Sequence, residues 1–338
     1  MKKKRGYTVL GRHRAFRSIL PQIFLAVSVT CFFLTKSKTS ASVVVSLRDN
    51  VLNLQEKDFV TGERLLELCD VAFFNREYVE DFPSVKLHAK HLIFIDEYIS
   101  AKTVEVVGRG KTFFIKPDWL NLFISDFLPL ITSEFILLTH MSDLRAGTME
   151  ALLKNSNMRA WYGCNMYPHI KTKSVPLGLE NVDMWQRTNV TRILRARTNR
   201  KTKILYVYFN LNSNLPQRTE ARTHLIQNGF EMQERGEWSK YVDELSRYKF
   251  CASPEGNGVD THRMWECLYL GVIPIVIKTP ELYSWYSDLP ILWVTSFQQV
   301  TQNFLENVRY RKDTLTGSKS LFSISSIQNS LDEELRHS

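Results

Sequence analysis

Short apolar runs alternate with longer amphipathic stretches through the first half of the chain. Compact apolar runs are typical of buried strands, and apolar positions three or four residues apart are typical of helices. The pattern predicts strands at Leu92–Ile95, Phe113–Ile115 and Phe135–Thr139. It predicts helices at Trp119–Leu130 and Gly147–Leu153.

The second half continues the alternation. The expected strands are Ile204–Phe209, Lys249–Ala252, Val272–Ile277 and Ile291–Val294, and the expected helices are Thr219–Gln227, Asp260–Leu270 and Ser296–Val308. Strands that alternate with helices predict an α/β fold with parallel sheets. The charged stretch 186–202 lacks an apolar period and is interpreted as a linker. We therefore expect α/β domains over 36–190 and 200–320, with a tail at 321–338 that is either a terminal helix or frayed.

An uncharged apolar run precedes the predicted domains. Residues 19–34 read ILPQIFLAVSVTCFFL, flanked by Arg17 and Lys36. We interpret 19–35 as a transmembrane signal-anchor, short but sufficient for a thin bilayer. Seven basic residues precede it and two follow, so 1–18 is expected in the cytosol and the body in the lumen. A cleaved signal peptide ending near Ala41 is the alternative, which the long basic segment disfavours.

The net charge of +9 reflects this N-terminal segment rather than the body. Residues 1–40 hold nine Lys and Arg and no acid, which leaves 35 basic and 35 acidic residues in the remainder. A body without net charge has no global electrostatic footprint for a nucleic acid. No nucleic-acid partner is therefore expected.

Two further features agree with a lumenal body. Asn189-Val190-Thr191 is a sequon for N-glycosylation. Four cysteines outside the apolar run could form two disulfides in any of three pairings, or serve as small buried hydrophobic residues: Cys69, Cys164, Cys251 and Cys267. No Cys/His spacing typical of zinc occurs, and neither a metal nor another cofactor is predicted.

The most informative segment is 248–277. A strand at Phe250–Ala252 leads into the Pro/Gly-rich loop Ser253–Gly258, and Asp260 or Thr261 then caps a helix. A loop that feeds a helix N-terminus is a geometry that binds anions. Arg263 lies in the first turn, where a cation is unfavourable for the helix dipole, so it is expected to have an anionic partner. That partner is either a ligand or Glu266, three residues on.

This segment resembles the carboxyl-terminal signature of exostosin-family glycosyltransferases. The resemblance rests on Phe250, Pro254, Gly256, Arg263, Glu266, Gly271 and Pro274. Weaker similarity extends upstream to 139–143, 161–165, 175–181, 208–210 and Arg218, so that it spans about 139–280.

The resemblance implies two Rossmann-like domains facing across a cleft, the GT-B arrangement, in a type II membrane protein of the Golgi or endoplasmic reticulum. It implies transfer of a sugar from a nucleotide-sugar donor, with UDP favoured, to a glycan or glycoprotein acceptor, with inversion. Such enzymes need no Asp-x-Asp metal motif, and the chain contains none. The donor-site residues that it implies are Arg218, Ser253, Gly256, Asn257, Gly258, Asp260, Arg263 and Glu266.

Within that site, Arg218, Arg263 and the backbone of the glycine loop would bind the diphosphate. Glu266 would accept hydrogen bonds from ribose or sugar hydroxyls. As the base we expect Asp143 first and His140 second, because both follow the Phe135–Thr139 strand, at an edge where α/β sheets bind ligands. Asp143 could instead be a turn or helix cap.

Two alternatives remain. One is a fucosyltransferase-like enzyme of the same architecture that uses a GDP-sugar, although the loop and residue pair typical of those enzymes are missing. The other is a non-catalytic lumenal glycan-binding or scaffold protein on a transferase fold.

Overall fold

The structure is a computed structural model that describes residues 44–47, 54–181, 189–234, 236–312 and 322–336. The predicted cytoplasmic tail and signal-anchor lie outside these residues. Within the described ranges, no helix combines the length and apolar character that crossing a membrane requires. Ser42–Ser338 forms one unit by its internal contacts.

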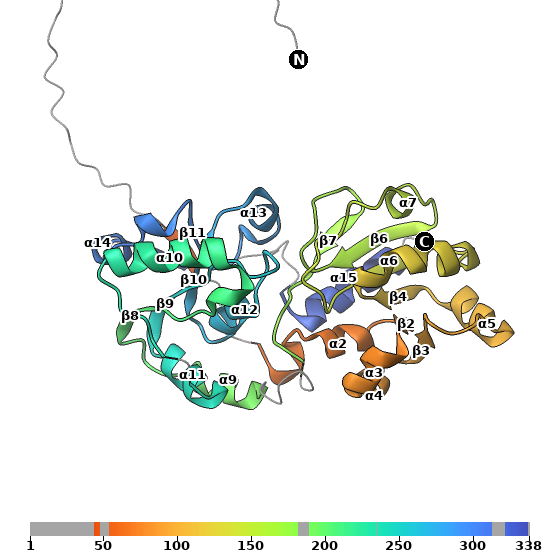
Figure 1. Cartoon of the computed structure of the whole chain (residues 1–338), viewed down its shortest axis with the longest axis horizontal. Coiled ribbons are helices and arrows are strands. Elements are labelled where there is room, and N and C mark those ends of the chain that lie inside the picture. The colour runs from red at the N-terminus through yellow and green to blue at the C-terminus, as the bar shows by residue number, and fades with distance from the viewer. Residues whose placement is uncertain (1–43, 48–53, 182–188, 235, 313–321, 337–338) are drawn as a thin grey trace, which may run out of the picture. The chain divides into compact units, whose positions relative to one another are not determined.

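A six-stranded sheet carries the N-terminal half (Figure 1). Its order is β3-β2-β4-β5-β6-β7, and every neighbouring pair is parallel. The strands are β2 (Val71–Phe74), β3 (His91–Phe94), β4 (Thr112–Ile115), β5 (Phe135–Thr139), β6 (Met158–Gly163) and β7 (Thr172–Ser174). All residues of β2, β4 and β5 are buried, as expected for a parallel sheet that is covered on both faces.

Alternate residues of β2 supply the two faces of this sheet. Val71 and Phe73 belong to one apolar cluster, and Ala72 and Phe74 belong to another. The helices of this half are α2 (Gly62–Glu67), α3 (Arg76–Asp81), α4 (Ser84–His88), α5 (Ala101–Arg109) and α7 (Glu150–Leu153). Between β4 and β5, a run of helical turns of mixed type extends over Pro117–Leu130 and includes α6 (Leu120–Leu122). The expected helix at Trp119–Leu130 is thus confirmed as helical, with irregular turns.

A four-stranded parallel sheet carries the C-terminal half, in the order β11-β10-β9-β8. Its strands are β8 (Lys203–Tyr206), β9 (Tyr248–Ala252), β10 (Ile273–Ile277) and β11 (Leu292–Val294). Its helices are α10 (Leu215–Gln227), α11 (Trp238–Leu245), α12 (His262–Tyr269), α13 (Pro280–Tyr286) and α14 (Gln302–Glu306). The predicted α/β class with parallel sheets is confirmed.

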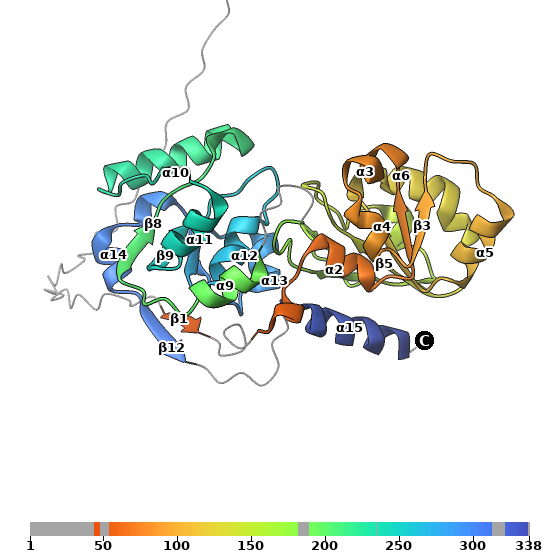
Figure 2. The same cartoon turned by 90° about the horizontal axis from the view of Figure 1, so that it is seen from below.

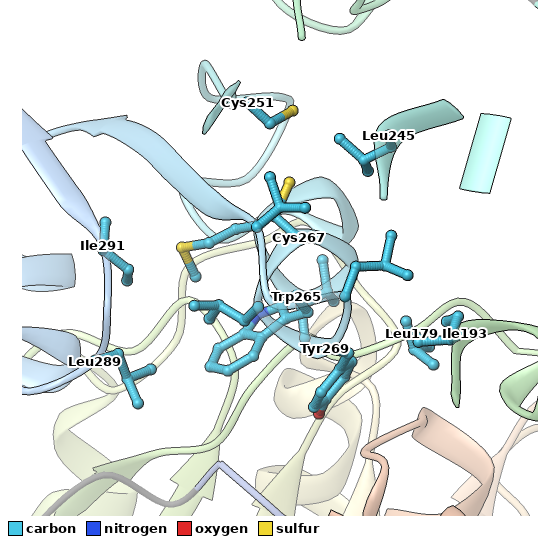
Figure 3. Packing of buried hydrophobic residues seen from close by; sticks show 14 of the residues in the cluster. Leu179, Ile193, Leu245, Cys251, Trp265, Cys267, Tyr269, Leu289 and Ile291 are labelled. Carbon is cyan, nitrogen blue, oxygen red and sulfur yellow. The ribbon is translucent and has the colours of Figure 1, made fainter. Parts of the chain in front are cut away.

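The largest apolar cluster surrounds α12 (Figure 3). Trp265 and Tyr269 of this helix are buried among Leu179, Leu245 and Ile291. The cluster therefore joins the segment after β7 to the C-terminal sheet, and it holds the buried face of α12 in place. A left-handed glycine, Gly271 at φ 65°, follows the end of the helix.

One predicted segment differs from the structure: the charged stretch interpreted as a linker contains a helix, α9 (Val190–Ala196), which buries Ile193 and Ala196 at i, i+3 spacing. Of the two alternatives for the tail, the structure shows the terminal helix, α15 (Ile324–Arg336), whose Ile327 and Leu331 pack in the same cluster as β2. Figures 1 and 2 both place this C-terminal helix beside the N-terminal sheet. A small parallel pair of β1 (Val44–Leu47) with β12 (Arg309–Lys312) completes the fold.

The four cysteines of the described residues are buried with free thiols, so the structure shows the buried-thiol alternative rather than two disulfides. Cys251 of β9 and Cys267 of α12 contact each other through their side chains. The thiol of Cys69 faces the Leu65 carbonyl, and that of Cys164 faces the Ser142 carbonyl.

Candidate functional site

A cavity of about 580 Å³ opens beyond the carboxyl ends of β8 and β9. This is the edge where open α/β sheets bind ligands, and the volume suits a small organic ligand. Its wall is formed mainly by aromatic and charged side chains: the rings of Tyr206, Tyr208, Phe209, Trp238 and Tyr241, the cations of Arg218 and Arg263, and the acids Glu180 and Glu266. We call it the arginine cavity.

Arg263 is positioned by the start of α12. Thr261 is the N-cap, and its side chain accepts the N–H of Met264. Arg263 follows in the first turn, with a side chain only 19% exposed. Its guanidinium donates to the carbonyl of Tyr208, and its Nε lies 3.6 Å from Oε2 of Glu266. Pairing with Glu266, one of the two predicted alternatives, is therefore present.

Three aromatic rings surround the Arg263 guanidinium. Its central carbon lies 4.7 Å from the ring centre of Tyr241, 5.8 Å from that of Tyr208 and 6.0 Å from that of Tyr206. Contacts at these distances stabilise a cation in a partly desolvated position. The arrangement keeps a permanent positive charge at the wall of the cavity.

Glu266 fixes the neighbouring helix α11. Its carboxylate accepts the hydroxyl of Tyr241 at 2.6 Å and the indole N–H of Trp238 at 3.3 Å. These bonds hold both rings at the cavity wall. A ligand hydroxyl would therefore share an already bonded carboxylate.

Arg218 from α10 is buried and clamps the loop after β9. Its guanidinium donates to the carbonyls of Glu255 at 2.7 Å, Asn210 at 2.5 Å and Pro254 at 3.5 Å. Burial, together with the charge of Arg263, lowers the pKa of Arg218. Two like charges thus lie close together in the cavity wall, which also carries the carboxylates of Glu180 and Glu266.

The loop glycines are required for packing within the protein. A Cβ at Gly256 would lie 3.0 Å from Nη2 of Arg218, and one at Gly258 would lie 2.7 Å from Nδ2 of Asn165. Neither glycine lines the arginine cavity. Their role in the structure is therefore close packing, where the sequence had suggested room for a ligand.

Ser253 and Asp260 are also turned inward. The Ser253 hydroxyl lies 3.2 Å from that of Thr261. The buried carboxylate of Asp260 accepts the N–H of Leu177 at 2.9 Å and the indole N–H of Trp265 at 2.6 Å. Burial raises the pKa of Asp260 to about 6, despite these donors. The structure thus places Arg218, Arg263 and Glu266 together at the cavity and leaves Ser253, Gly256, Asn257, Gly258 and Asp260 out of its wall.

The two predicted bases line a second, smaller pocket of about 130 Å³. Asp143 is exposed, and its Oδ2 accepts the amide N–H of Asn257 at 3.0 Å. His140 is buried, and its Nε2 lies 2.9 Å from the carbonyl oxygen of Pro176. His262 lines both this pocket and the arginine cavity.

Sequence reasoning missed the aromatic walls and His262. Tyr206 and Tyr208 both lie in the predicted strand Ile204–Phe209, of which β8 ends at Tyr206. Trp238 and Tyr241 lie on α11, a helix that the pattern did not predict. The available signal for His262 was its position directly before Arg263, at the start of the helix that Thr261 caps.

Asn189 is exposed and caps α9, since its side-chain oxygen accepts the N–H of Arg192 at 2.9 Å. Within the described part of the chain, no group of three or more His, Cys, Asp or Glu side chains is placed to hold a metal ion.

Comparison with models of known protein families finds no match, and a search of curated proteins finds none either. The resemblance to exostosins therefore stays a prediction from the quoted residues.

Proposed function

We propose that the protein is a glycosyltransferase of GT-B type, similar to exostosins. It would transfer a sugar from a nucleotide-sugar donor, with UDP favoured, to a glycan or glycoprotein acceptor. The observation that carries this proposal is the placement of Arg263. A partly buried cation, ringed by tyrosines and next to Arg218, lines a cavity at the carboxyl ends of parallel strands.

The donor would bind with its diphosphate at Arg263. Nη1 of Arg263 donates to the Tyr208 carbonyl and Nε lies 3.6 Å from Oε2 of Glu266, and the N–H groups that these contacts leave would donate to phosphate oxygens. Arg218 would act chiefly through the loop that it clamps and through its charge. The rings of Trp238 and Tyr241 supply flat surfaces on which a nucleobase can stack.

The reaction would be a direct displacement at the anomeric carbon. The acceptor oxygen forms a bond to this carbon while the bond to the diphosphate oxygen breaks, and that electron pair leaves with the nucleotide. The positive charge of the arginines stabilises the leaving diphosphate. The acceptor proton passes to a base, for which Asp143 and then His140 are the candidates. The proposal requires no metal ion or other cofactor.

The cellular setting is part of the proposal. A signal-anchor at 19–35 would hold the protein as a single-pass type II protein in the Golgi or endoplasmic reticulum membrane, with the body in the lumen. Acceptors delivered through the secretory pathway would then meet the cavity.

Donor binding by the full chain tests the proposal. Calorimetry with a panel of UDP- and GDP-sugars should show binding, strongest for a UDP-sugar, and Arg263→Gln should weaken it at least about tenfold by removing a charge-assisted contact. Arg247→Gln is the matched control, because Arg247 is exposed and outside the cavity. Unchanged affinity in Arg263→Gln would contradict the phosphate role.

The same panel separates the alternatives. Preference for GDP-sugars would indicate the fucosyltransferase-like enzyme. Binding without any donor hydrolysis or transfer would indicate a non-catalytic glycan-binding protein.

A further inference from the structure

Two of the buried cysteines face each other across a strand and a helix. Cys251 lies on β9, and Cys267 lies on α12, the helix that carries Arg263 (Figure 3). Both thiols are free, and their side chains are in contact. Two cysteines can be joined without moving the backbone only where their side chains already meet, and this pair fulfils that condition.

The course of the chain explains why these two thiols meet. The elements β9, α12 and β10 follow one another, and β10 pairs in parallel with β9. Cys251 is in register with Pro274 of β10. The carbonyl of Cys267 accepts the N–H of Val272, one residue before that strand, at 2.8 Å. The end of α12 is therefore tied to the strand next to β9, which keeps Cys267 close to Cys251.

Among the residues that the structure describes, the other two cysteines have no second thiol beside them. Cys69 packs in the same cluster as β2, and its thiol faces the Leu65 carbonyl. Cys164 belongs to the same cluster as the pair, but its thiol faces the Ser142 carbonyl. These two residues are therefore matched controls, because they are equally buried thiols without a cysteine neighbour.

The pair also touches Arg263, the residue proposed to bind the donor diphosphate. Arg263 precedes Cys267 by four residues, so both side chains lie on the same face of α12. Burial raises the pKa of Cys251, but its hydrogen bond with Cys267 and the charge of Arg263 outweigh burial and bring this pKa below the ordinary 9.0. A bond between the two sulfurs would thus hold the helix face that carries Arg263 against β9.

We propose that Cys251 and Cys267 form a disulfide when the chain folds in an oxidising compartment. This inference rests on the lumenal setting proposed above and is independent of glycosyl transfer. Disulfides form and persist in the secretory lumen, whereas the cytosol keeps thiols reduced. Because both cysteines are 0% exposed, the bond forms before α12 closes over β9.

The oxidant is an external disulfide of the glutathione class. The thiolate of one cysteine attacks a sulfur of this disulfide and releases one external thiol, which leaves a mixed disulfide. The thiolate of the other cysteine attacks the protein sulfur of the mixed disulfide and releases the second external thiol. Two protein thiols are oxidised, one external disulfide is reduced, and the two protons pass to the released thiols.

Differential thiol labelling of the full chain tests the proposal. The chain is expressed in eukaryotic cells, denatured in iodoacetamide, reduced, and then labelled with N-ethylmaleimide. Mass spectrometry of the peptides should find the second label on Cys251 and Cys267 and the first label on Cys69 and Cys164. Cys251→Ser should give Cys267 the first label, whereas Cys69→Ser should leave the second label on the pair.

Thermal unfolding gives a second measurement. The bond would close a loop over residues 252–266. Cleaving a disulfide across a loop of this length should lower the melting midpoint of the wild type by about 5 °C. The same reductant should leave the midpoint of Cys251→Ser unchanged.

A refolding arm separates this inference from the proposed setting and function. The full chain is unfolded in urea and refolded in detergent with a mixture of reduced and oxidised glutathione. If all four cysteines carry the first label in cells but refolding joins Cys251 to Cys267, the disulfide assignment stands and the lumenal setting fails. If the pair carries the first label in both arms, or either cysteine is joined to Cys69 or Cys164, the inference is overturned. Nucleotide-sugar binding is measured separately, and the wild-type labels do not depend on a variant that fails to fold.

Discussion

The Asp260 carboxylate holds the backbone of Leu177, whose N–H lies 2.9 Å from Oδ2. The other oxygen accepts the indole N–H of Trp265 on α12. Two donors converge on one buried side chain, so only a group with two acceptor atoms can satisfy both. Asp260 thereby joins the segment after β7 to the start of the helix that carries Arg263.

Asp260→Asn should change how stability depends on pH. The native carboxyl keeps its proton up to about pH 6, whereas the ordinary pKa is 3.8. Between these values the native state binds more protons than the unfolded state, so raising the pH favours unfolding. The wild type should therefore lose up to about 3 kcal/mol relative to the variant as pH rises from about 4 to about 6. Urea unfolding at a series of pH values measures this, with Asp81→Asn, at an exposed position, as the control. Parallel curves for the wild type and Asp260→Asn would refute the prediction.

Arg218→Lys should loosen the loop after β9. A single ammonium group cannot reproduce the planar fork that reaches the carbonyls of Glu255, Asn210 and Pro254. Loss of two such bonds should cost about 2–4 kcal/mol of unfolding free energy, and donor affinity should fall with it. Arg222→Lys is the matched control, because Arg222 is exposed one turn further along α10. Equal stability of the two variants would show that the clamp contributes little.

The sequence predicted the elements that obey a simple period and missed those whose stability comes from distant partners. The run Phe135–Thr139 is apolar throughout and was placed correctly as β5. By contrast, the apolar face of α9 (Val190, Ile193, Leu194 and Ala196) is short and lies within a charged stretch, so the segment was interpreted as a linker. The helix α15 stayed one of two alternatives for the tail, because its packing against the N-terminal sheet joins residues far apart in the sequence, such as Tyr162 and Ser330.

The candidate site followed the same division. Arg263 and Glu266 were named from their spacing at a helix start, Arg218 was named from the resemblance alone, and the structure brings the three together. Asp260 was named for the same site, but its neighbours Leu177 and Trp265 draw it into the interior. Whether a polar side chain faces a cavity or a buried donor depends on tertiary contacts, which spacing does not encode.

His140 should produce the opposite pH dependence from Asp260. Its native pKa is about 4, below the ordinary value of 6.5, because burial disfavours the charged ring. Between these values the unfolded state binds more protons, so stability falls as pH falls. The wild type should lose about 3 kcal/mol relative to His140→Gln between pH 6.5 and pH 4. His91→Gln, at an exposed position, should show no such difference. The Asp260 and His140 effects oppose each other from about pH 4 to pH 6, so the stability curve of the wild type alone does not reveal them and the variants are needed. If the stability difference between the wild type and His140→Gln does not change with pH, the prediction of a neutral buried ring is contradicted.

Asn189 should carry a glycan if the body lies in the lumen. Its side-chain oxygen caps α9, so a glycan on the nitrogen leaves the cap intact. In eukaryotic cells the full chain should gain mobility on gels after peptide N-glycosidase treatment. Thr191→Ala should remove this shift without touching the cap, and Asn189→Asp should remove it while keeping the cap oxygen. Asn189→Ala should in addition lose about 1 kcal/mol of stability with the cap.

The wild-type chain could show no glycosidase-sensitive shift on gels. Either the lumenal orientation is then wrong or this sequon is not used, and a protease-protection assay on intact vesicles distinguishes the two.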